Sequence, residues 1–313
     1  MKFIQEFQNN DRVIGHYLCK QKQTLRTRAD KSYYSLRLQD KTGIIEAKVW
    51  EITGDIQDFE EGDYIKVDGL VHTYMSELQM KVSKIRKSEP GECDPADYIP
   101  STSKDIGQLY SQIVDYINSI ENGYIKGMME NIIIRNEEIA QAFKIRSAAK
   151  SMHHSFMGGL LEHTVTVVQI CDFLSGIYPE ADRDILISGA ILHDIGKIYE
   201  LSDFPLNDYT DDGRLLGHVI IGASIVEKAA GEIPGFPHTL AVLLRHCVLS
   251  HHGEYEFGSP KRPKILEALI LHAADNMDAK VKAFQDSIAV SPGTWTGFHK
   301  MFERYLRKTD YEK

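Results

Sequence analysis

The chain has 313 residues, enough for two domains that each bury a hydrophobic core. No apolar run approaches the ~20 residues of a membrane-spanning helix, and the N-terminus lacks the apolar stretch of a signal peptide, so we expect a cytoplasmic protein that binds no membrane. The four cysteines follow no metal-binding spacing, which excludes a zinc finger and fits a reducing compartment. The net charge of −9 by itself argues against a nucleic-acid partner, because binding a polyanion needs a basic surface.

The charge is divided unevenly along the chain. Residues 1–90 hold 15 Lys and Arg against 14 Asp and Glu, whereas residues 91–313 hold 21 against 31. The stretch from residue 20 to 37 has six basic residues and one acid, Asp30. It is therefore the best candidate for contact with a nucleic-acid backbone. The basic residues are Lys20, Lys22, Arg26, Arg28, Lys31 and Arg37.

Five short runs in the first 90 residues have the alternating or apolar pattern of β-strands. They cover residues 13–20, 33–38, 44–50, 64–71 and 78–85. Turn residues precede the third and fourth runs, and residues 51–59 between them are predicted to be a short helix or irregular. Five strands in about 75 residues fit an OB-fold β-barrel, which we place at residues 1–88.

OB-fold barrels bind single-stranded nucleic acid through a basic groove and aromatic rings on which the bases stack. Tyr33, Tyr34, Trp50 and Tyr74 offer such rings. Any one of these rings could instead fill the small barrel core. We predict that the domain binds a single strand, with Tyr33 and Tyr34 joining the basic residues of the 20–37 stretch.

Residues 89–104 contain three proline turns without periodic apolar residues and are predicted to be a linker. From Asp105 onward, apolar residues recur at steps of three and four, so residues 105–313 are predicted to be an all-α helical bundle, its first helix capped by Ser103. Further helices are predicted at 124–143, 157–176, 181–193, 217–230, 237–251, 263–285 and 295–307. The acidic segment 203–212 is either a surface loop near a functional site or a plain connector.

Seven residues that can bind metals are spread over the helical half of the chain. They are His163, His193, Asp194, His218, His251, His252 and Asp275. A set of imidazoles and carboxylates without thiolates suits Mn²⁺, Co²⁺, Fe²⁺ or Mg²⁺ better than a structural zinc. The number of ligands is enough for two divalent metal ions, most readily Mn²⁺, if one carboxylate is shared.

His193 and Asp194 are neighbours, and neighbours on a helix point about 100° apart. Both can therefore bind metal only at a helix end or if Asp194 bridges two ions. A bridged pair of ions clamps the attacking and leaving oxygens of a phosphoryl displacement and generates hydroxide at neutral pH. Gly196 and Gly253, each close behind a ligand pair, are expected to let the chain turn sharply beside the ions.

Four sequence segments resemble a known family. The motif HDIGK at residues 193–197 is typical of the HD-domain phosphohydrolase superfamily. The segments SMHHSFMGGLLEHT (151–164), LSHHGEYEFGSP (249–260) and HAADNMDAKV (272–281), preceded by a small β domain, are similar to the YhaM-type 3′→5′ exoribonucleases. The resemblance implies one metal site formed by His163, His193, Asp194 and Asp275, and a second formed by Asp194, His218, His251 and His252. It also implies catalytic roles for Asp194 and for Lys197, which would neutralise a phosphate.

Together these observations predict a metal-dependent 3′→5′ exoribonuclease that hydrolyses single-stranded RNA to nucleoside 5′-monophosphates, with single-stranded DNA left open as a further substrate. Hydrolysis follows from the ligand set, whereas polarity and RNA preference follow from the resemblance alone. Two alternatives stay open: a small-nucleotide phosphohydrolase acting on dNTPs or cyclic dinucleotides, and a single-strand DNA-binding, replication-associated protein. A homo-oligomer is compatible with the sequence, and the roles of His153, His154 and His246 are undecided.

Overall fold

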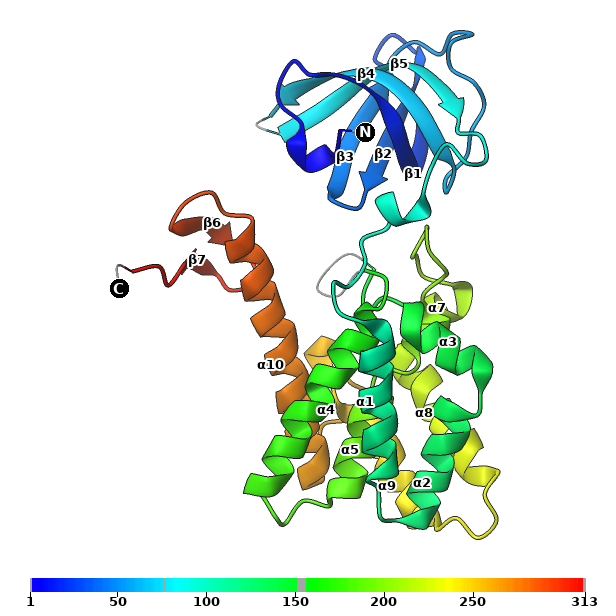
Figure 1. The fold of residues 1–313 in the computed structure, drawn as a ribbon, viewed down its shortest axis with the longest axis vertical. Helices are drawn as coiled ribbons and strands as arrows, with labels where there is room; N and C mark the ends of the chain where they lie inside the picture. The colour runs from blue at the N-terminus through cyan, green and yellow to red at the C-terminus, as the bar shows by residue number, and fades with distance from the viewer. Residues whose placement is uncertain (1, 76, 151–155, 312–313) are drawn as a thin grey trace. The chain divides into compact units, whose positions relative to one another are not determined.

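The computed structural model describes residues 2–75, 77–150 and 156–311, so His153 and His154 lie outside the described residues. Its contacts divide the chain into two compact units (Figure 1). The first comprises Met1–Ser101 together with Ser202–Asp208, and the second comprises Thr102–Leu201 together with Tyr209–Lys313.

The first unit is a closed five-stranded barrel, as predicted for an OB-fold. Its strands are β1 (Arg12–Arg26), β2 (Ser32–Asp40), β3 (Gly43–Val49), β4 (Tyr64–Tyr74) and β5 (Glu77–Lys87), preceded by a 3₁₀ turn at Ile4–Glu6. The order around the barrel is β1-β2-β3-β5-β4. The parallel pairing of β3 with β5 closes the ring, and all other pairs are antiparallel.

The barrel core comes from the inward-facing residues of each strand, joined by Phe59 from the irregular segment between β3 and β4. Gly69 in β4 is needed for this packing because a Cβ there would lie 2.8 Å from Met80 Cγ. The turn from β2 to β3 is fixed by the buried Asp40, whose Oδ1 accepts hydrogen bonds from Thr42 N (2.7 Å) and Gly43 N (3.1 Å). This turn had been predicted from its residue types.

β1 is much longer than the predicted strand at 13–20, because it continues to Arg26 and pairs with the start of β2. A β-bulge between Cys19 and Gln21 shifts the register of this pair. Such a bulge changes which side chains point into the barrel. The second half of β1, the loop 27–31 and β2 therefore form one two-stranded extension that carries most of the predicted basic residues.

Residues 89–101 belong to the first unit by their contacts. Arg86 pairs with Glu92 through two bonds of 2.6 Å, Gln39 Nε2 donates to Tyr98 O (3.0 Å), and a 3₁₀ turn spans Pro95–Asp97. Tyr98 is 2% exposed.

The second unit is a helical bundle. Its helices are α1 (Ile106–Asn118), α2 (Gly123–Met129), α3 (Glu137–Ile145), α4 (Gly159–Ile177), α5 (Arg183–Leu192), α6 (Lys197–Glu200), α7 (Asp211–Leu215), α8 (Gly217–Gly231), α9 (His238–Ser250) and α10 (Leu266–Ala289). α4 and α5 pack against α10, and α5 packs against α9. One continuous apolar core joins these helices.

Two helix boundaries differ from the prediction. Asp105, not Ser103, caps α1, since its side chain accepts a hydrogen bond from Gln108 N (2.9 Å). The predicted helix at 124–143 is broken into α2, a π-helix at Glu130–Ile134, and α3. The break comes where the Asn136 side chain accepts from Ile139 N and starts a new helix.

The predicted helix at 295–307 is wrong. This segment forms a hairpin of two antiparallel strands, β6 (Trp295–His299) and β7 (Arg304–Arg307), which contact α10 (Figure 1). Its apolar residues, spaced three apart, satisfy a helical period, but Trp, Thr, Phe and Tyr favour strands. The β-bulge between Trp295 and Phe298 lets these two rings, three residues apart, lie on the same face of a strand, so their spacing fits a bulged strand as well as a helix.

α4 has the length and apolar composition of a membrane-spanning helix, contrary to the expectation from sequence. It has 19 residues with a mean hydropathy of 1.2. In the structure 44% of that stretch is buried, and the helix packs against α1, α3, α5 and α10. Apolar core helices have this same composition. Among the described residues it is the one helix of this kind.

Candidate metal centre

All seven predicted metal ligands lie together in the helical unit. His163 projects from the first turns of α4 and Asp275 from α10, while His218 is the second residue of α8. The two ligand pairs each follow the end of a helix. His193 and Asp194 come directly after α5, and His251 and His252 directly after α9.

The first cluster contains His163, His193, Asp194 and Asp275. His163 Nε2 lies 3.2 Å from His193 Nε2, 3.2 Å from Asp275 Oδ1 and 3.7 Å from Asp194 Oδ2. His193 Nε2 lies 3.4 Å from Asp194 Oδ2. Two imidazole nitrogens and two carboxylate oxygens thus converge on one small volume, and His163 and His193 are almost fully buried.

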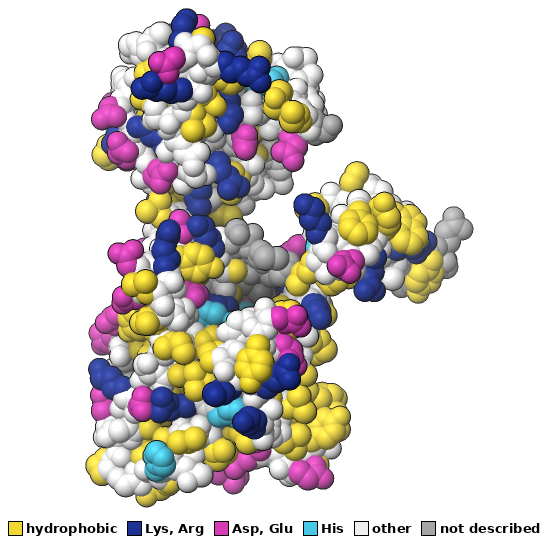
Figure 2. All heavy atoms as spheres, turned by 180° about the vertical axis from the view of Figure 1, so that it is seen from behind, with side chains coloured by type: hydrophobic (Ala, Val, Ile, Leu, Met, Phe, Trp, Pro, Cys, Tyr) yellow, Lys and Arg dark blue, Asp and Glu magenta, His cyan; other side chains and the backbone are white. Residues whose placement is uncertain are grey.

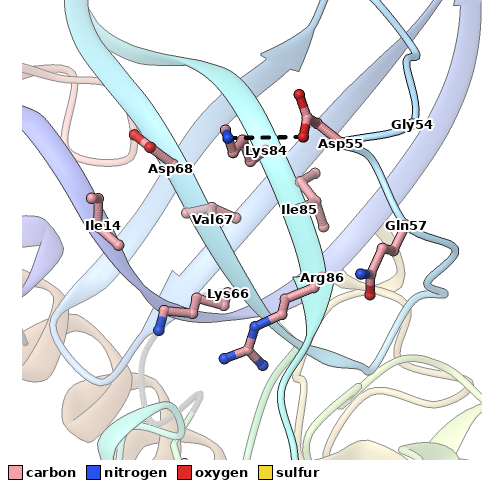
Figure 3. Close-up of a pocket in the computed structure, with 10 residues that line it drawn as sticks. All are labelled: Ile14, Gly54, Asp55, Gln57, Lys66, Val67, Asp68, Lys84, Ile85 and Arg86. Carbon is pink, nitrogen blue, oxygen red and sulfur yellow. Dashed lines mark ion pairs between the residues drawn. The ribbon is translucent and has the colours of Figure 1, made fainter.

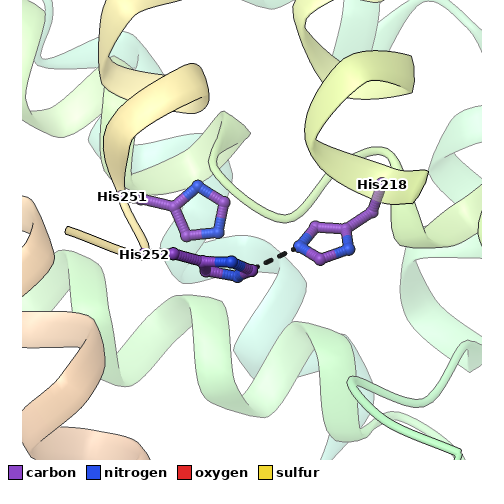
Figure 4. A group of neighbouring side chains, drawn as sticks. All are labelled: His218, His251 and His252. Carbon is purple, nitrogen blue, oxygen red and sulfur yellow. Dashed lines mark hydrogen bonds between the residues drawn. The ribbon is translucent and has the colours of Figure 1, made fainter. Parts of the chain in front are cut away.

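The second cluster contains His218, His251 and His252, whose rings converge in Figure 4. His218 Nε2 lies 3.3 Å from His252 Nε2. The rings of His251 and His252 are 4.2 Å apart between centroids.

Asp194 faces both clusters. Its Oδ2 points to the first cluster, while its Oδ1 lies 3.5 Å from His218 Nε2 and 3.7 Å from His251 Nε2. Among the described residues, Asp194 Oδ1 and His251 Nε2 are buried polar atoms without a hydrogen-bond partner. Buried polar atoms are nearly always partnered, so two that face each other fit a site for a cation. The donor set therefore fits two divalent ions that share Asp194.

Each of the five histidine rings is held by a hydrogen bond at its Nδ1 atom. His163 Nδ1 bonds Asp278 Oδ2 (2.6 Å) and His218 Nδ1 bonds Glu200 Oε1 (2.9 Å). The remaining three Nδ1 atoms donate to the backbone oxygens of Ala190, Val248 and Phe257. Such bonds fix the ring and direct the Nε2 lone pair to a metal.

The electrostatics of the site favour positive charge. Burial raises the pKa of Asp194, but the charges of Lys197 and His193 outweigh it and hold this pKa well below its usual range. Burial lowers the pKa of His163, but hydrogen bonds to Asp275 and Asp278 more than reverse this and raise it to about 9. Both shifts show that the carboxylates of the cluster attract cations.

Lys197 lies beside the shared carboxylate. Its Nζ is 2.6 Å from Asp194 Oδ2. Burial lowers the pKa of Lys197, but the charge of Asp194 outweighs this and raises it, so the side chain stays an ammonium. Because the Lys197 ammonium is hydrogen-bonded to Asp194, it is close enough to contact a phosphate bound beside that carboxylate.

The two glycines near the ligand pairs differ in role. Gly253 has φ +79°, which supports the predicted turn, and His272 packs against it while bonding His251 O (2.7 Å). Gly196 does not make the sharp turn that was predicted, because its φ of −63° is ordinary helix. A Cβ at Gly196 would instead overlap His218 O, so this glycine allows the close approach of α6 and α8.

Sequence reasoning missed three residues that support the cluster: Glu200, His272 and Asp278. Glu200 and Asp278 each lie three residues after a predicted site residue, and this spacing puts them on the same helix face. That spacing was the available signal. The undecided His246 is not part of the cluster, since its Nε2 accepts from Lys264 N (2.9 Å).

The barrel separates the predicted nucleic-acid residues onto two faces. Tyr33 and Arg37 lie on the outer face of β2, where Tyr33 stacks on Trp50 with centroids 4.7 Å apart. Lys48 on β3 adds a cation to this face, and its Nζ donates to Ser35 Oγ (2.6 Å). Arg37 lies directly across from Glu46.

Lys22 and Tyr34 point the other way, toward the barrel interior. The Lys22 ammonium donates to Phe59 O and lies 5.1 Å from the Tyr34 ring centre. Tyr34 in turn packs edge-on against Phe59. The Lys20 ammonium donates to the backbone of Pro205 and Leu206. These contacts occupy side chains that were predicted to bind nucleic acid.

The other predicted cations lie at the tip of the extension. Arg28 and Lys31 are exposed, while Arg26 pairs with Asp30 at 2.8 Å. A separate hollow of about 320 Å³ lies on β1, β4 and β5 (Figure 3). Lys66, Lys84 and Arg86 line it, with Lys84 paired to Asp55 at 3.8 Å. It contains none of the predicted residues.

Comparison with known proteins agrees with both units. Residues 160–280 match the HD domain family, and residues 20–87 match the family described as OB-fold nucleic acid binding domain. The 3′-5′ exoribonuclease YhaM of Bacillus pumilus is 35% identical over 94% of this chain and 94% of its own length. The YhaM proteins of a Geobacillus species and of Bacillus subtilis are each 36% identical over 85% of this chain, covering 82% and 84% of their own lengths.

The fold and the ligand cluster together define an HD-domain phosphohydrolase joined to an OB-fold nucleic-acid-binding domain. Within that class, the chain belongs to the YhaM family of 3′-5′ exoribonucleases.

Proposed function

We propose that this protein is a metal-dependent 3′→5′ exoribonuclease that removes nucleoside 5′-monophosphates from single-stranded RNA. The proposal rests on the geometry of Asp194, whose two carboxylate oxygens each face a separate histidine cluster. The chain that carries this geometry is related to YhaM over most of its length. That geometry suits a pair of ions, and a pair of ions suits hydrolysis of a phosphodiester.

His163, His193, Asp194 and Asp275 would hold one ion, and Asp194, His218, His251 and His252 the other. Bound there, divalent ions would make water a better nucleophile and offset negative charge on the phosphoryl oxygens. We assign Mn²⁺ as the preferred metal, with Co²⁺, Fe²⁺ or Mg²⁺ as substitutes. A set of imidazole and carboxylate ligands without thiolates suits these divalent ions.

The chain's own residues complete the site. Glu200 and Asp278 keep His218 and His163 in the orientation that presents Nε2. Lys197 would exchange part of its contact with Asp194 for a phosphate oxygen of the substrate. The burial of His163, His193 and Asp194 excludes bulk water, which strengthens each of these electrostatic contacts.

The barrel would bind the RNA upstream of the reacting end. Its outer face offers the stacked pair Tyr33 and Trp50 with the cation Lys48, and the tip of the extension offers Arg28 and Lys31. Stacking tolerates any base, and these contacts read no 2′-hydroxyl, so single-stranded DNA is a second ligand. We also propose a cytoplasmic location, which fits an RNA substrate. A homo-oligomer is compatible with this function, and sedimentation of the purified protein measures the oligomeric state.

The test is hydrolysis of a 5′-labelled single-stranded RNA with Mn²⁺, beside the same sequence as DNA and a panel of dNTPs and cyclic dinucleotides. We expect a ladder that shortens by single nucleotides from the 3′ end, with 5′-monophosphates as product. Cleavage of the small nucleotides alone would identify a nucleotide phosphohydrolase. Binding of single-stranded DNA without any hydrolysis would identify a binding protein.

A further inference from the structure

The β6–β7 hairpin has one buried face and one open face. Leu306 is 2% exposed, and its neighbours Tyr305 and Arg307 point to the opposite side of β7. Tyr305 pairs with Phe298 and Arg307 with Trp295, so these four side chains share the open face. The β-bulge between Trp295 and Phe298 is what lets both rings face the same way.

The open face is aromatic and exposed. Trp295 is 59% exposed, Phe298 57% and Tyr305 61%. The rings of Phe298 and Tyr305 lie 5.6 Å apart between centroids. Three large exposed rings on so short a ribbon are unusual for a surface that contacts water alone.

The same hairpin is rich in cations. Residues 295–311 hold the four cations Lys300, Arg304, Arg307 and Lys308 against two acids, in a half of the chain that is otherwise strongly acidic. The part of the chain that the structure describes contains no ion pair to any of the four. Arg304 and Arg307 donate to backbone oxygens of the hairpin itself. Figure 2 shows this mixture of hydrophobic and basic side chains on the hairpin.

We propose that the open face of the hairpin is a second binding surface for single-stranded RNA, on which bases stack against Trp295, Phe298 and Tyr305 while Arg307 contacts phosphate. Exposed rings interleaved with unpaired cations are the combination that binds single strands. A second copy of this chain is a poorer occupant, because two copies of one face would bring like charges together.

The hairpin stands at a defined distance from the metal centre. α10 carries Asp275 and continues unbroken to Ala289, next to the hairpin, which is about 20 Å at 1.5 Å per residue. The surface would therefore hold nucleotides several positions 5′ of the bond being cleaved. This inference rests on the proposed function, since it assigns part of the same substrate's path.

Intrinsic fluorescence tests the contact directly. The chain has two tryptophans, Trp50 and Trp295, so Trp50→Phe leaves Trp295 as the single emitter. In EDTA, which prevents hydrolysis, we expect a 12-nucleotide oligouridylate to quench Trp295 emission and UMP to leave it unchanged. Emission that does not respond to the oligonucleotide at saturating concentration would overturn the proposal.

Substitutions in the otherwise native protein test how much the open face of the hairpin contributes to RNA binding. Phe298→Ala and Tyr305→Ala should each raise the Kd for the oligonucleotide about fivefold or more, and raise KM on long RNA without changing kcat. Hydrolysis of a dinucleotide, too short to reach the hairpin, should be unaffected. Phe298→Tyr and Tyr305→Phe keep both rings and should keep full affinity, which separates loss of stacking from loss of folding.

The matched control is Phe173→Ala, which removes a still more exposed ring (70%) from α4. If the hairpin variants bind and digest long RNA as the control does, the proposal is wrong. A change in sedimentation mass in that same case would assign the face to contacts between copies. Quenching of Trp295 in a protein with no nuclease activity would overturn the proposed function instead, while leaving the RNA-binding surface intact.

Discussion

At the scale of single residues, Asp194 is expected to have the largest influence because it faces both clusters of candidate ligands. Its Oδ2 faces one cluster and its Oδ1 the other. Asp194→Asn keeps the shape but removes the charge that attracts two cations.

We therefore expect Asp194→Ala and Asp194→Asn to lose both metal equivalents and to lower turnover by roughly 10³-fold. Binding of RNA to the barrel should persist. Elemental analysis of the purified variants, beside an RNA ladder assay, measures both effects. A variant with two bound ions and appreciable turnover would contradict the shared-ligand arrangement.

Lys197 is predicted to act on substrate and not on metal. Lys197→Ala should lower kcat/KM by about 10²-fold while metal content stays at two ions per chain. Lys197→Arg, which keeps the charge, should restore part of the activity. Loss of metal from Lys197→Ala would show that the contact with Asp194 holds the metal site together.

Asp278 tests the role of the groups behind the ligands. Asp278→Asn weakens the hydrogen bond that fixes the ring of His163, so metal affinity should fall by about 10- to 100-fold. Asp286→Asn, on the same helix but exposed, is the control. Competition with a fluorescent chelator gives both affinities, and equal values for the two variants would exclude a positioning role for Asp278.

At the scale of secondary-structure elements, the β1–β2 extension is expected to set the salt dependence of RNA binding. Arg28→Glu and Lys31→Glu should each lower the slope of log Kd against log salt by about 0.7, the value for one phosphate contact on a single strand. Arg26→Glu should have a smaller effect, because Arg26 already pairs with Asp30. Filter binding at several salt concentrations measures the slopes. If the variants have the same slope as the native protein, the contacts with RNA phosphates lie elsewhere on the protein.

The secondary-structure elements also show which features of the structure the sequence could predict. The clustering of the seven candidate ligands was predictable because each is a metal-binding residue type at a helix end or on an apolar helix, in an order typical of one superfamily. The split of the basic stretch was not predictable, because the bulge at Cys19 and Gln21 changes the register of β1. A bulge also underlies the wrong helix at 295–307, because it puts Trp295 and Phe298, three residues apart, on one face of a strand.

At the scale of the whole molecule, the two units are expected to respond differently to metal removal. Ions that bind only the folded helical unit stabilise it, and the stabilisation grows with the ratio of ion concentration to Kd. Among the residues that the structure describes, none of those in the two clusters belongs to the barrel.

EDTA should therefore lower the melting temperature of the helical unit by several degrees and leave that of the barrel unchanged. Differential scanning calorimetry resolves the two transitions, and added Mn²⁺ should restore the first. Asp194→Ala provides the control, since its melting should not respond to EDTA. An equal shift of both transitions would mean that the units unfold as one.

The unbroken helix α10 has a consequence for the end of digestion. If the hairpin binds RNA as proposed, the helix is a rigid spacer that sets a minimum length below which an RNA at Asp275 no longer reaches the hairpin. Degradation should slow sharply at that length and leave a population of short oligonucleotides. The length of these products would then depend on the length of α10. Lengthening α10 by two turns, about 11 Å, should therefore shift the accumulating products to longer oligonucleotides.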